Sequence, residues 1–369
     1  FAFPAVILAR SAGIQRMSGD GGVSRLCGYP LLHNENDDKE GVENSVWCKL
    51  SAVGYSQNPL AMPILPHRFR RCLVQSATLS AIKRHERFLM DTATPTPPTP
   101  PPPSTSFAAA RLIGTPEAPL FVDVRKAEDF AASEHFIPGA VRWNYDAGDA
   151  PPAEIASAST AVAYCVKGLH VGMTGAEKLR EKSLDASFLE GGLRQWMEAG
   201  AMSVKKRPDL GVTGESISRW VTRARPKIDR IACPWLVRRF IDPRAQFFYL
   251  PTNEVFAFAE ANNAVAYDIP GAPLEHAGEM CSFDSFLRAF ELKSPALERM
   301  AAIVRGADTD TPNLAPQSAG LLAISLGFSK NIADDHTMLD AMMPMYDALY
   351  RWCIDAVDSR DEKHNWKPA

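Results

Sequence analysis

The segment AVAYCVKGLHVG, residues 161–172, decides the fold. Its first four residues form a short apolar run, which is typical of a strand buried in a parallel sheet. The run ends at Cys165, a loop containing Gly168 follows, and we expect a helix to begin near Thr174. A strand, a short loop and a helix in this order predict the carboxyl edge of an α/β sheet, where such sheets hold their functional groups.

The loop after the strand is suited to a reactive thiol. The backbone N–H groups of residues 166–171 and the positive end of the following helix dipole would surround Cys165. A thiol in such surroundings loses its proton more readily than a free cysteine does. Lys167 and His170 would add positive charge, and Gly168 lets the loop curl without a Cβ clash. The sequence therefore predicts a nucleophilic Cys165 beside an anion-binding site.

Strands and helices alternate on both sides of this loop. Apolar runs predict strands at 120–124, 140–144, 161–165 and 186–189. Helices are expected between them, at 127–133, 175–182 and 193–199. This alternation predicts a doubly wound parallel sheet, so the first fold class is α/β.

Four motifs in this region resemble the rhodanese family. They are FVDVR at 121–125, HFIPGA at 135–140, the cysteine loop, and LEGGL at 189–193 followed by Trp196. The resemblance covers about 108–202. It implies a sulfurtransferase in which Cys165 takes a sulfur atom from thiosulfate or another sulfane-sulfur donor and holds it as a persulfide.

The loop also allows two alternatives to sulfur transfer. The same fold hosts phosphatases whose loop is one residue longer and closes with an arginine, but Val171 stands at that place here, which favours sulfur chemistry. Leu169 and Gly172 depart from many rhodaneses, and Gly172 replaces a hydroxyl that steadies the persulfide. The second alternative is therefore a non-catalytic domain in which Cys165 is a buried structural residue. Asp123 and Arg125 are expected to form a structural pair.

The second half of the chain contains an unusual run at 219–242, which holds Arg223, Arg225, Lys227, Arg230, Arg238 and Arg239 together with Cys233 and Trp235. This run resembles the opening of the ChrB-type chromate-resistance domain. The segments His276 to Asp284, RGADTD at 305–310 and GLLAIS at 320–325 continue the resemblance as far as Cys353.

Chromate is a tetrahedral dianion and a strong oxidant. A protein that binds it needs cationic hydrogen-bond donors for the oxyanion, and thiols or imidazoles could serve as ligands or, for thiols, as reductants. We expect the cationic donors to be Arg223, Arg225, Lys227 and Arg230. Candidate metal ligands are Cys233, His276, Cys281 and His336. The alternatives are that the cysteines are core residues and that the arginines pair with Asp242, Asp308 and Asp310.

The chain divides into five predicted parts. Residues 1–89 are expected to be disordered or, if translation starts at Met90, upstream sequence read as coding. The other parts are a proline-rich linker at 90–107, the rhodanese-like domain at 108–202, a linker at 203–216 and a mainly helical α+β domain at 217–358.

Composition narrows the functional classes. The net charge of -3 gives no overall attraction to nucleic acid, and we see no basic recognition helix, so no nucleic-acid partner is expected. No apolar run reaches membrane-spanning length. Seven cysteines without a CxxC pair indicate a reducing cytoplasm. We expect no cofactor. The two functional hypotheses are a sulfurtransferase for chromate resistance and a non-enzymatic chromate-sensing or regulatory protein.

Overall fold

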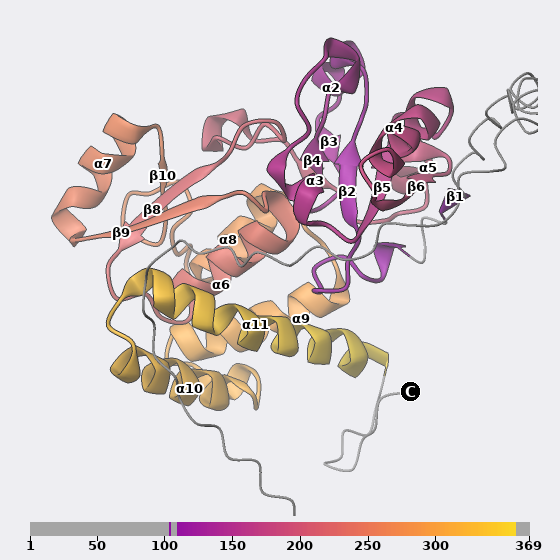
Figure 1. Cartoon of the computed structure of the whole chain (residues 1–369). Coiled ribbons are helices and arrows are strands. Elements are labelled where there is room, and N and C mark those ends of the chain that lie inside the picture. Colours follow the sequence, from indigo (N-terminus) through magenta and orange to yellow (C-terminus); the bar gives the residue numbers. More distant parts are fainter. Residues whose placement is uncertain (1–102, 105–108, 359–369) are drawn as a thin grey trace, which may run out of the picture. The chain divides into compact units, whose positions relative to one another are not determined.

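The computed structural model describes residues 103–104 and 109–358, with side chains from 109 to 356 (Figure 1). The predicted segment 1–89, the Met90 start and most of the proline-rich linker at 90–107 lie outside the described residues. None of the helices within the described ranges is long and apolar enough to cross a membrane.

The first domain is built on a parallel five-stranded sheet in the order β1-β6-β5-β2-β4. β5 lies at its centre and pairs with β2 on one side and β6 on the other. The strands are β1 (Pro103–Ser104), β2 (Leu120–Asp123), β4 (Val141–Arg142), β5 (Thr160–Tyr164) and β6 (Asp185–Leu189).

Helices cover both faces of this sheet, because side chains alternate along each strand. Ala161 and Ala163 of β5 pack with Leu179 of α4, whereas Val162 and Tyr164 belong to the opposite core, with Trp196 of α5. The predicted doubly wound α/β fold is confirmed. Its helical elements are α2 (Ala127–Ala132), η1 (Tyr145–Ala147), α3 (Ala153–Ser157), α4 (His170–Arg180) and α5 (Gly192–Glu198).

Two local predictions differ from the structure. The helix after the cysteine loop begins at His170 rather than near Thr174, because Gly168 turns the chain with a φ of +64° and leaves only a short loop. The segment 203–216, predicted to be a linker, contains ordered elements. Its β7 (Val204–Lys205) pairs antiparallel with β3 (His135–Phe136), and η2 (Pro208–Leu210) follows.

The second domain is mainly helical, as predicted, around a small parallel sheet in the order β10-β8-β9. Its strands are β8 (Arg219–Arg223), β9 (Gln246–Leu250) and β10 (Val265–Ala266). Its helices are α6 (Asp229–Leu236), η3 (Val237–Ile241), η4 (Thr252–Glu254), α7 (Val255–Asn262), α8 (Ser282–Ala289), α9 (Pro295–Asp308), η5 (Pro312–Leu314), α10 (Ser318–Asn331) and α11 (Asp335–Asp358).

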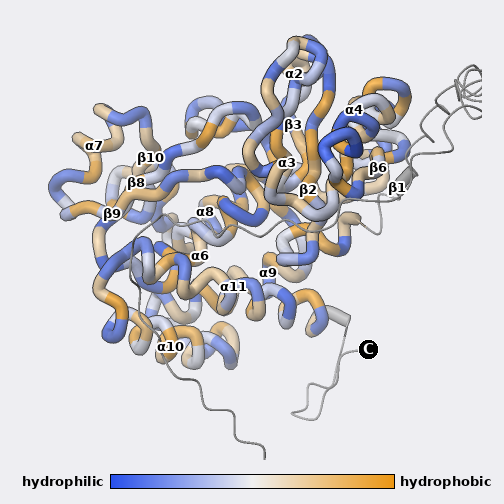
Figure 2. Tube along the Cα trace, viewed as in Figure 1, coloured by the Kyte–Doolittle hydropathy of each residue, from blue (hydrophilic) through white to orange (hydrophobic). Residues whose placement is uncertain are grey.

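The long helix α11 is amphipathic, and hydrophobic and hydrophilic residues alternate along it (Figure 2). Met338, Met342, Tyr346 and Cys353 recur at helical spacing and are buried. They join a core that also contains Trp235 of α6. The face of α11 that carries the methionines is therefore a packing surface.

The cores of the two domains are continuous. Phe240 of η3 accepts a hydrogen bond from the N–H of Gly139 at 2.7 Å through its carbonyl oxygen. A Cβ on Gly114 would lie 2.1 Å from the Phe240 ring, so only glycine fits there. Residues of both domains, from Ile113 to Cys353, belong to one hydrophobic cluster.

Candidate functional sites

The first candidate site is the cysteine loop at the carboxyl end of β5. Cys165 follows Tyr164 directly, and the residue is only 6% exposed. The loop is tied to the start of α5, because Leu193 N–H donates to the Cys165 carbonyl at 2.9 Å and Arg194 N–H donates to the Val166 carbonyl at 3.0 Å. These bonds fix the backbone on both sides of the Cys165–Val166 peptide.

Glycines make this close approach possible. A Cβ on Gly168 would lie 2.4 Å from both the Gly191 nitrogen and the Leu189 carbonyl oxygen. A Cβ on Gly192 would lie 2.4 Å from the Cys165 carbonyl oxygen. The two glycines after Glu190 therefore form the support on which the cysteine loop rests.

The first turn of α4 lies against the thiol. Gly172 is the third residue of α4, and a Cβ built on it would lie 3.4 Å from the Cys165 Sγ atom. The positive end of an 11-residue helix is thus beside the sulfur. The same distance shows that a hydroxyl side chain at position 172 would be within reach of Sγ, and glycine leaves that contact unmade.

The predicted cations of the loop face solvent. Lys167 and His170 are exposed, and Leu169 between them is 62% exposed. His170 Nδ1 lies 3.4 Å from the Thr174 hydroxyl, one turn further along α4. The Lys167 ammonium makes no interaction with another described residue. Both cations are available to an anion approaching from outside, and their role stays a prediction.

A buried triad beneath the loop shapes this end of the sheet. Arg125 Nε donates to the Asp123 carboxylate at 2.9 Å, and the Tyr164 hydroxyl donates to the same carboxylate at 2.8 Å. All three side chains are almost completely buried, and burial raises the pKa of Tyr164 well above its usual value. The prediction that Asp123 and Arg125 form a structural pair is confirmed.

In the second domain, the predicted anion-binding arginines already have partners. Arg223 and Arg230 both contact the Asp268 carboxylate, at 3.0 and 3.1 Å. Arg225 donates to the carbonyls of Ile332 and Ala333 just after α10, at 3.0 and 2.8 Å.

Lys227 is half-buried, and its ammonium makes no interaction with another described residue. Binding of an oxyanion by this set stays a prediction. The expectation that these arginines pair with Asp242 or Asp308 was wrong, because Asp242 contacts Arg244 and Asp308 contacts His276.

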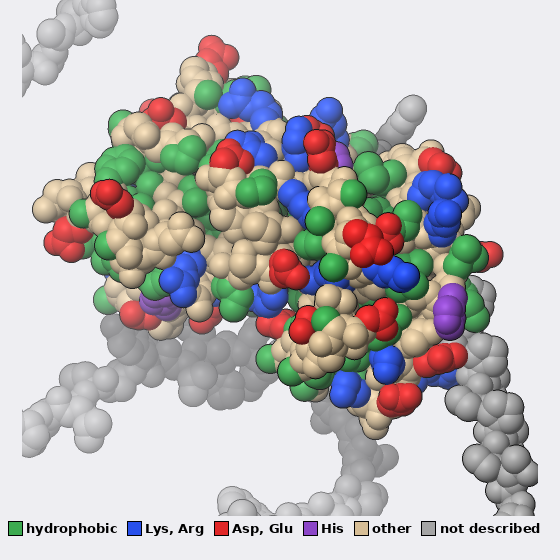
Figure 3. Space-filling view, turned by 90° about the horizontal axis from the view of Figure 1, so that it is seen from above, with side chains coloured by type: hydrophobic (Ala, Val, Ile, Leu, Met, Phe, Trp, Pro, Cys, Tyr) green, Lys and Arg blue, Asp and Glu red, His purple; other side chains and the backbone are tan. Residues whose placement is uncertain are grey.

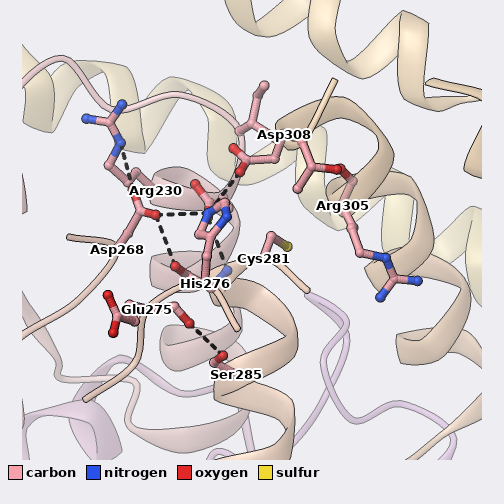
Figure 4. A network of polar contacts seen from close by, with 12 residues as sticks. Arg230, Asp268, Glu275, His276, Cys281, Ser285, Arg305 and Asp308 are labelled. Carbon is pink, nitrogen blue, oxygen red and sulfur yellow. Dashed lines mark hydrogen bonds and ion pairs between the residues drawn. The ribbon is translucent and has the colours of Figure 1, made fainter. Parts of the chain in front are cut away.

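The second candidate site is a cluster of three aspartates around His276 (Figure 4). The His276 Nε2 atom lies 3.2 Å from Asp229, 3.3 Å from Asp268 and 3.2 Å from Asp308. Asp229 is the first residue of α6, Asp308 is the last residue of α9, and Asp268 follows β10. Four segments distant in sequence thus meet at one imidazole nitrogen.

Burial dominates the electrostatics of this cluster. Burial raises the pKa of the Asp229 carboxyl, which is 1% exposed. The hydrogen bond to Asp229 raises the pKa of His276 to about 9. His276 itself is 41% exposed and forms the open side of the site.

Only His276 of the four predicted metal ligands belongs to this group. Within the described ranges, one group of three or more His, Cys, Asp or Glu residues has its ligand atoms within 4.8 Å of one another. This group consists of Asp229, His276 and Asp308. Cys233 and Cys281 are buried, and burial raises the pKa of both thiols, so they stay protonated. His336 packs its ring edgewise on Tyr249 at 5.5 Å.

The face of the molecule seen in Figure 3 carries Lys and Arg side chains interspersed with Asp and Glu. Mixed charge of this kind gives no extended positive field for a nucleic-acid backbone on that face.

Comparison with known proteins defines both domains. Residues 108–199 match the family model of the rhodanese-like domain, and residues 220–353 match that of the ChrB C-terminal domain. The chain therefore carries a rhodanese-like domain followed by a ChrB C-terminal domain.

A curated relative is Protein ChrB of Cupriavidus metallidurans, which is 32% identical over 133 residues. That match covers 36% of this chain and 40% of the relative, so the two proteins correspond over less than half of either length.

Proposed function

We propose that this protein acts in chromate resistance and that Cys165 is a sulfur-carrying nucleophile. The observation that supports this most is the position of the Cys165 sulfur. It lies at the carboxyl end of the central strand, against the first turn of α4, where the positive end of the helix dipole faces it. The match of this region to the rhodanese-like domain agrees with such a role.

The proposed reaction has two steps. The Cys165 thiolate attacks the outer sulfur of thiosulfate, the sulfur–sulfur bond of thiosulfate breaks, and sulfite leaves with the bonding electron pair. This leaves a persulfide on Cys165. An acceptor nucleophile such as cyanide then attacks the terminal sulfur, forms thiocyanate and returns the thiolate. Lys167 and His170 would hold the anionic donor outside the loop.

The test is a thiosulfate-to-cyanide assay on the wild type and on Cys165→Ser. We expect the variant to lose activity, whereas Cys233→Ala, which removes a buried thiol remote from the loop, should retain it. Mass spectrometry of the isolated protein should find one added sulfur atom on the peptide that contains Cys165. Equal rates in the wild type and Cys165→Ser would reject the proposal.

The second candidate function is non-enzymatic chromate sensing by the C-terminal domain. It is favoured by two cations of this domain: the Lys227 ammonium, which has no hydrogen bond or ion pair within the described residues, and Arg223, whose side chain is 35% exposed. Calorimetric titration with chromate should then give saturable binding that weakens in Lys227→Ala and Arg223→Ala. Sulfate, an anion of similar shape, serves as the control ligand. Heat no larger than that of buffer dilution would exclude this function.

We also propose a cytoplasmic location. The four cysteines among the described residues, Cys165, Cys233, Cys281 and Cys353, are all free thiols, as expected in a reducing compartment. Cell fractionation with an antibody against the chain would test it, and recovery with the periplasmic or membrane fraction would contradict it.

A further inference from the structure

We propose that Asp229, His276 and Asp308, supported by Asp268, bind a divalent cation that prefers oxygen and nitrogen ligands, of the Mn²⁺ or Fe²⁺ class. The proposal is independent of the chemistry of Cys165. It rests on the convergence of these side chains around His276 (Figure 4).

The cluster gathers several acceptors around one donor. His276 Nε2 can carry one hydrogen, yet three carboxylate oxygens lie within 3.3 Å of it. Asp268 has other donors, because Arg223, Arg230 and the Ser282 hydroxyl all contact it. Asp229 and Asp308 share the imidazole and a hydrogen bond to each other.

Asp229 and Asp308 place two carboxyl groups beside one imidazole. Asp229 also receives the Ser282 N–H, but only at 3.4 Å. The two carboxyls share a hydrogen bond, which requires a proton between them. A divalent cation among Asp229, Asp308 and a neutral His276 would take the place of that proton and neutralise both carboxylates.

Asp308 supplies a second, independent reason. It is the last residue of α9, a helix of 14 residues, and a negative side chain at a helix C-terminus is unfavourable. The same carboxylate lies next to Asp229 at the start of α6. A cation between the two would stabilise both the end of α9 and this carboxylate pair.

The site is prearranged and has an entrance. Asp229 and Asp268 are only 1% and 4% exposed, and the contacts of Arg230 and Ser282 fix the orientation of Asp268 as supporting groups do around metal ligands. His276, 41% exposed, forms the outer side of the cluster, from which water molecules would complete the coordination.

The donor set determines the class of ion. Carboxylates with one imidazole suit Mn²⁺, Fe²⁺ and similar ions, whereas Cu⁺ and other soft ions require thiolates. Cys233 and Cys281 lie outside the ligand group, so the site lacks soft ligands.

The test uses the full chain after treatment with a chelator. Titration with MnCl₂, followed through the electron paramagnetic resonance of free Mn²⁺, should show one saturable site. His276→Gln and Asp308→Asn should weaken binding by roughly tenfold or more. The control Asp340→Asn, at a residue whose side chain is 71% exposed and pairs with Arg238, should bind as the wild type does.

A spectroscopic measurement keeps the test decisive even if a variant folds poorly. Bound Mn²⁺ in the wild type should show hyperfine coupling to nitrogen-14 from a directly ligating imidazole. No saturable binding, no nitrogen coupling, or equal binding in Asp308→Asn would each overturn the proposal. Cys165→Ser should bind Mn²⁺ normally, which separates this result from the outcome of the sulfur-transfer assay.

Discussion

The substitution Gly168→Ala tests whether the support beneath the cysteine loop is as tight as the structure indicates. Gly168 has a φ of +64°, and an added Cβ would lie 2.4 Å from the Gly191 nitrogen and the Leu189 carbonyl oxygen. Both atoms are backbone, so no side-chain rotation can relieve the overlap. The loop or the start of α5 has to move.

The expected loss of stability has two parts. An alanine in the left-handed region costs about 1 kcal/mol relative to glycine. Forcing a methyl group into a filled space adds about 1–3 kcal/mol. The sum is about 2–4 kcal/mol. Gly200 provides a matched control, since its φ is +72° and nothing lies within 4 Å of its Cβ position, so Gly200→Ala should show only the first part.

Urea unfolding of the wild type and both variants measures the difference in stability. The rate at which a thiol reagent alkylates Cys165 under native conditions reports the position of the loop. We expect Gly168→Ala to be less stable than Gly200→Ala and to change the alkylation rate. If both alanines had the same effect on unfolding, the close contact described for this loop would be refuted.

Three further predictions concern polar and charged residues that stabilise the two domains. Asp123→Asn should lower the free energy of unfolding, measured in urea, by about 3–5 kcal/mol, because it leaves the buried Arg125 without its counter-ion. Tyr164→Phe removes only a hydrogen bond to Asp123 and should lower it by about 1–2 kcal/mol. Equal losses in the two variants would contradict the importance of the ion pair. Arg225→Ala should lower the free energy of unfolding by about 1–2 kcal/mol, because it removes the hydrogen bonds to the carbonyls after α10. Lys227→Ala should leave the free energy of unfolding nearly unchanged. If urea unfolding showed Lys227→Ala to be the less stable variant, Arg225 would not cap this helix. Partial burial, and to a smaller extent the positive charge of the nearby Arg125, lowers the pKa of Lys206 from 10.5 to about 8. The unfolded chain therefore binds more protons between these values, and wild-type stability should rise with pH from about 8 to 10.5. In Lys206→Met the free energy of unfolding should depend less on pH over this range. If the variant showed the same pH dependence as the wild type, the half-buried Lys206 ammonium would not be its cause.

Much of the first domain could be predicted from the sequence. The apolar run before Cys165 predicts a buried strand, and the glycines of the 189–193 motif predict a tight turn. Both features depend on residues that are adjacent in the sequence. The start of α4 at His170 cannot be predicted from the apolar pattern, because the pattern does not show how sharply Gly168 turns the chain.

The Asp–His cluster could not be predicted in the same way. Asp229, Asp268, His276 and Asp308 lie on four segments without a short spacing, and only the fold brings them together. Nearness in sequence pointed to Cys281 as the partner of His276, but the thiol lies in the core at 0% exposure. Asp268 carries a local signal, because it follows the apolar run AVAY at 264–267, and functional groups gather at the carboxyl ends of such strands.

The contact of Gly114 and Gly139 with Phe240 has a consequence for biosynthesis. The rhodanese-like domain emerges from the ribosome before the second domain does, so the surface that Phe240 and its neighbours cover is exposed to water at that stage. Nascent chains in this condition are prone to aggregate and to be held by chaperones. Expression of a fragment ending near residue 202 would make this exposure permanent, and we expect such a fragment to be recovered mainly from inclusion bodies.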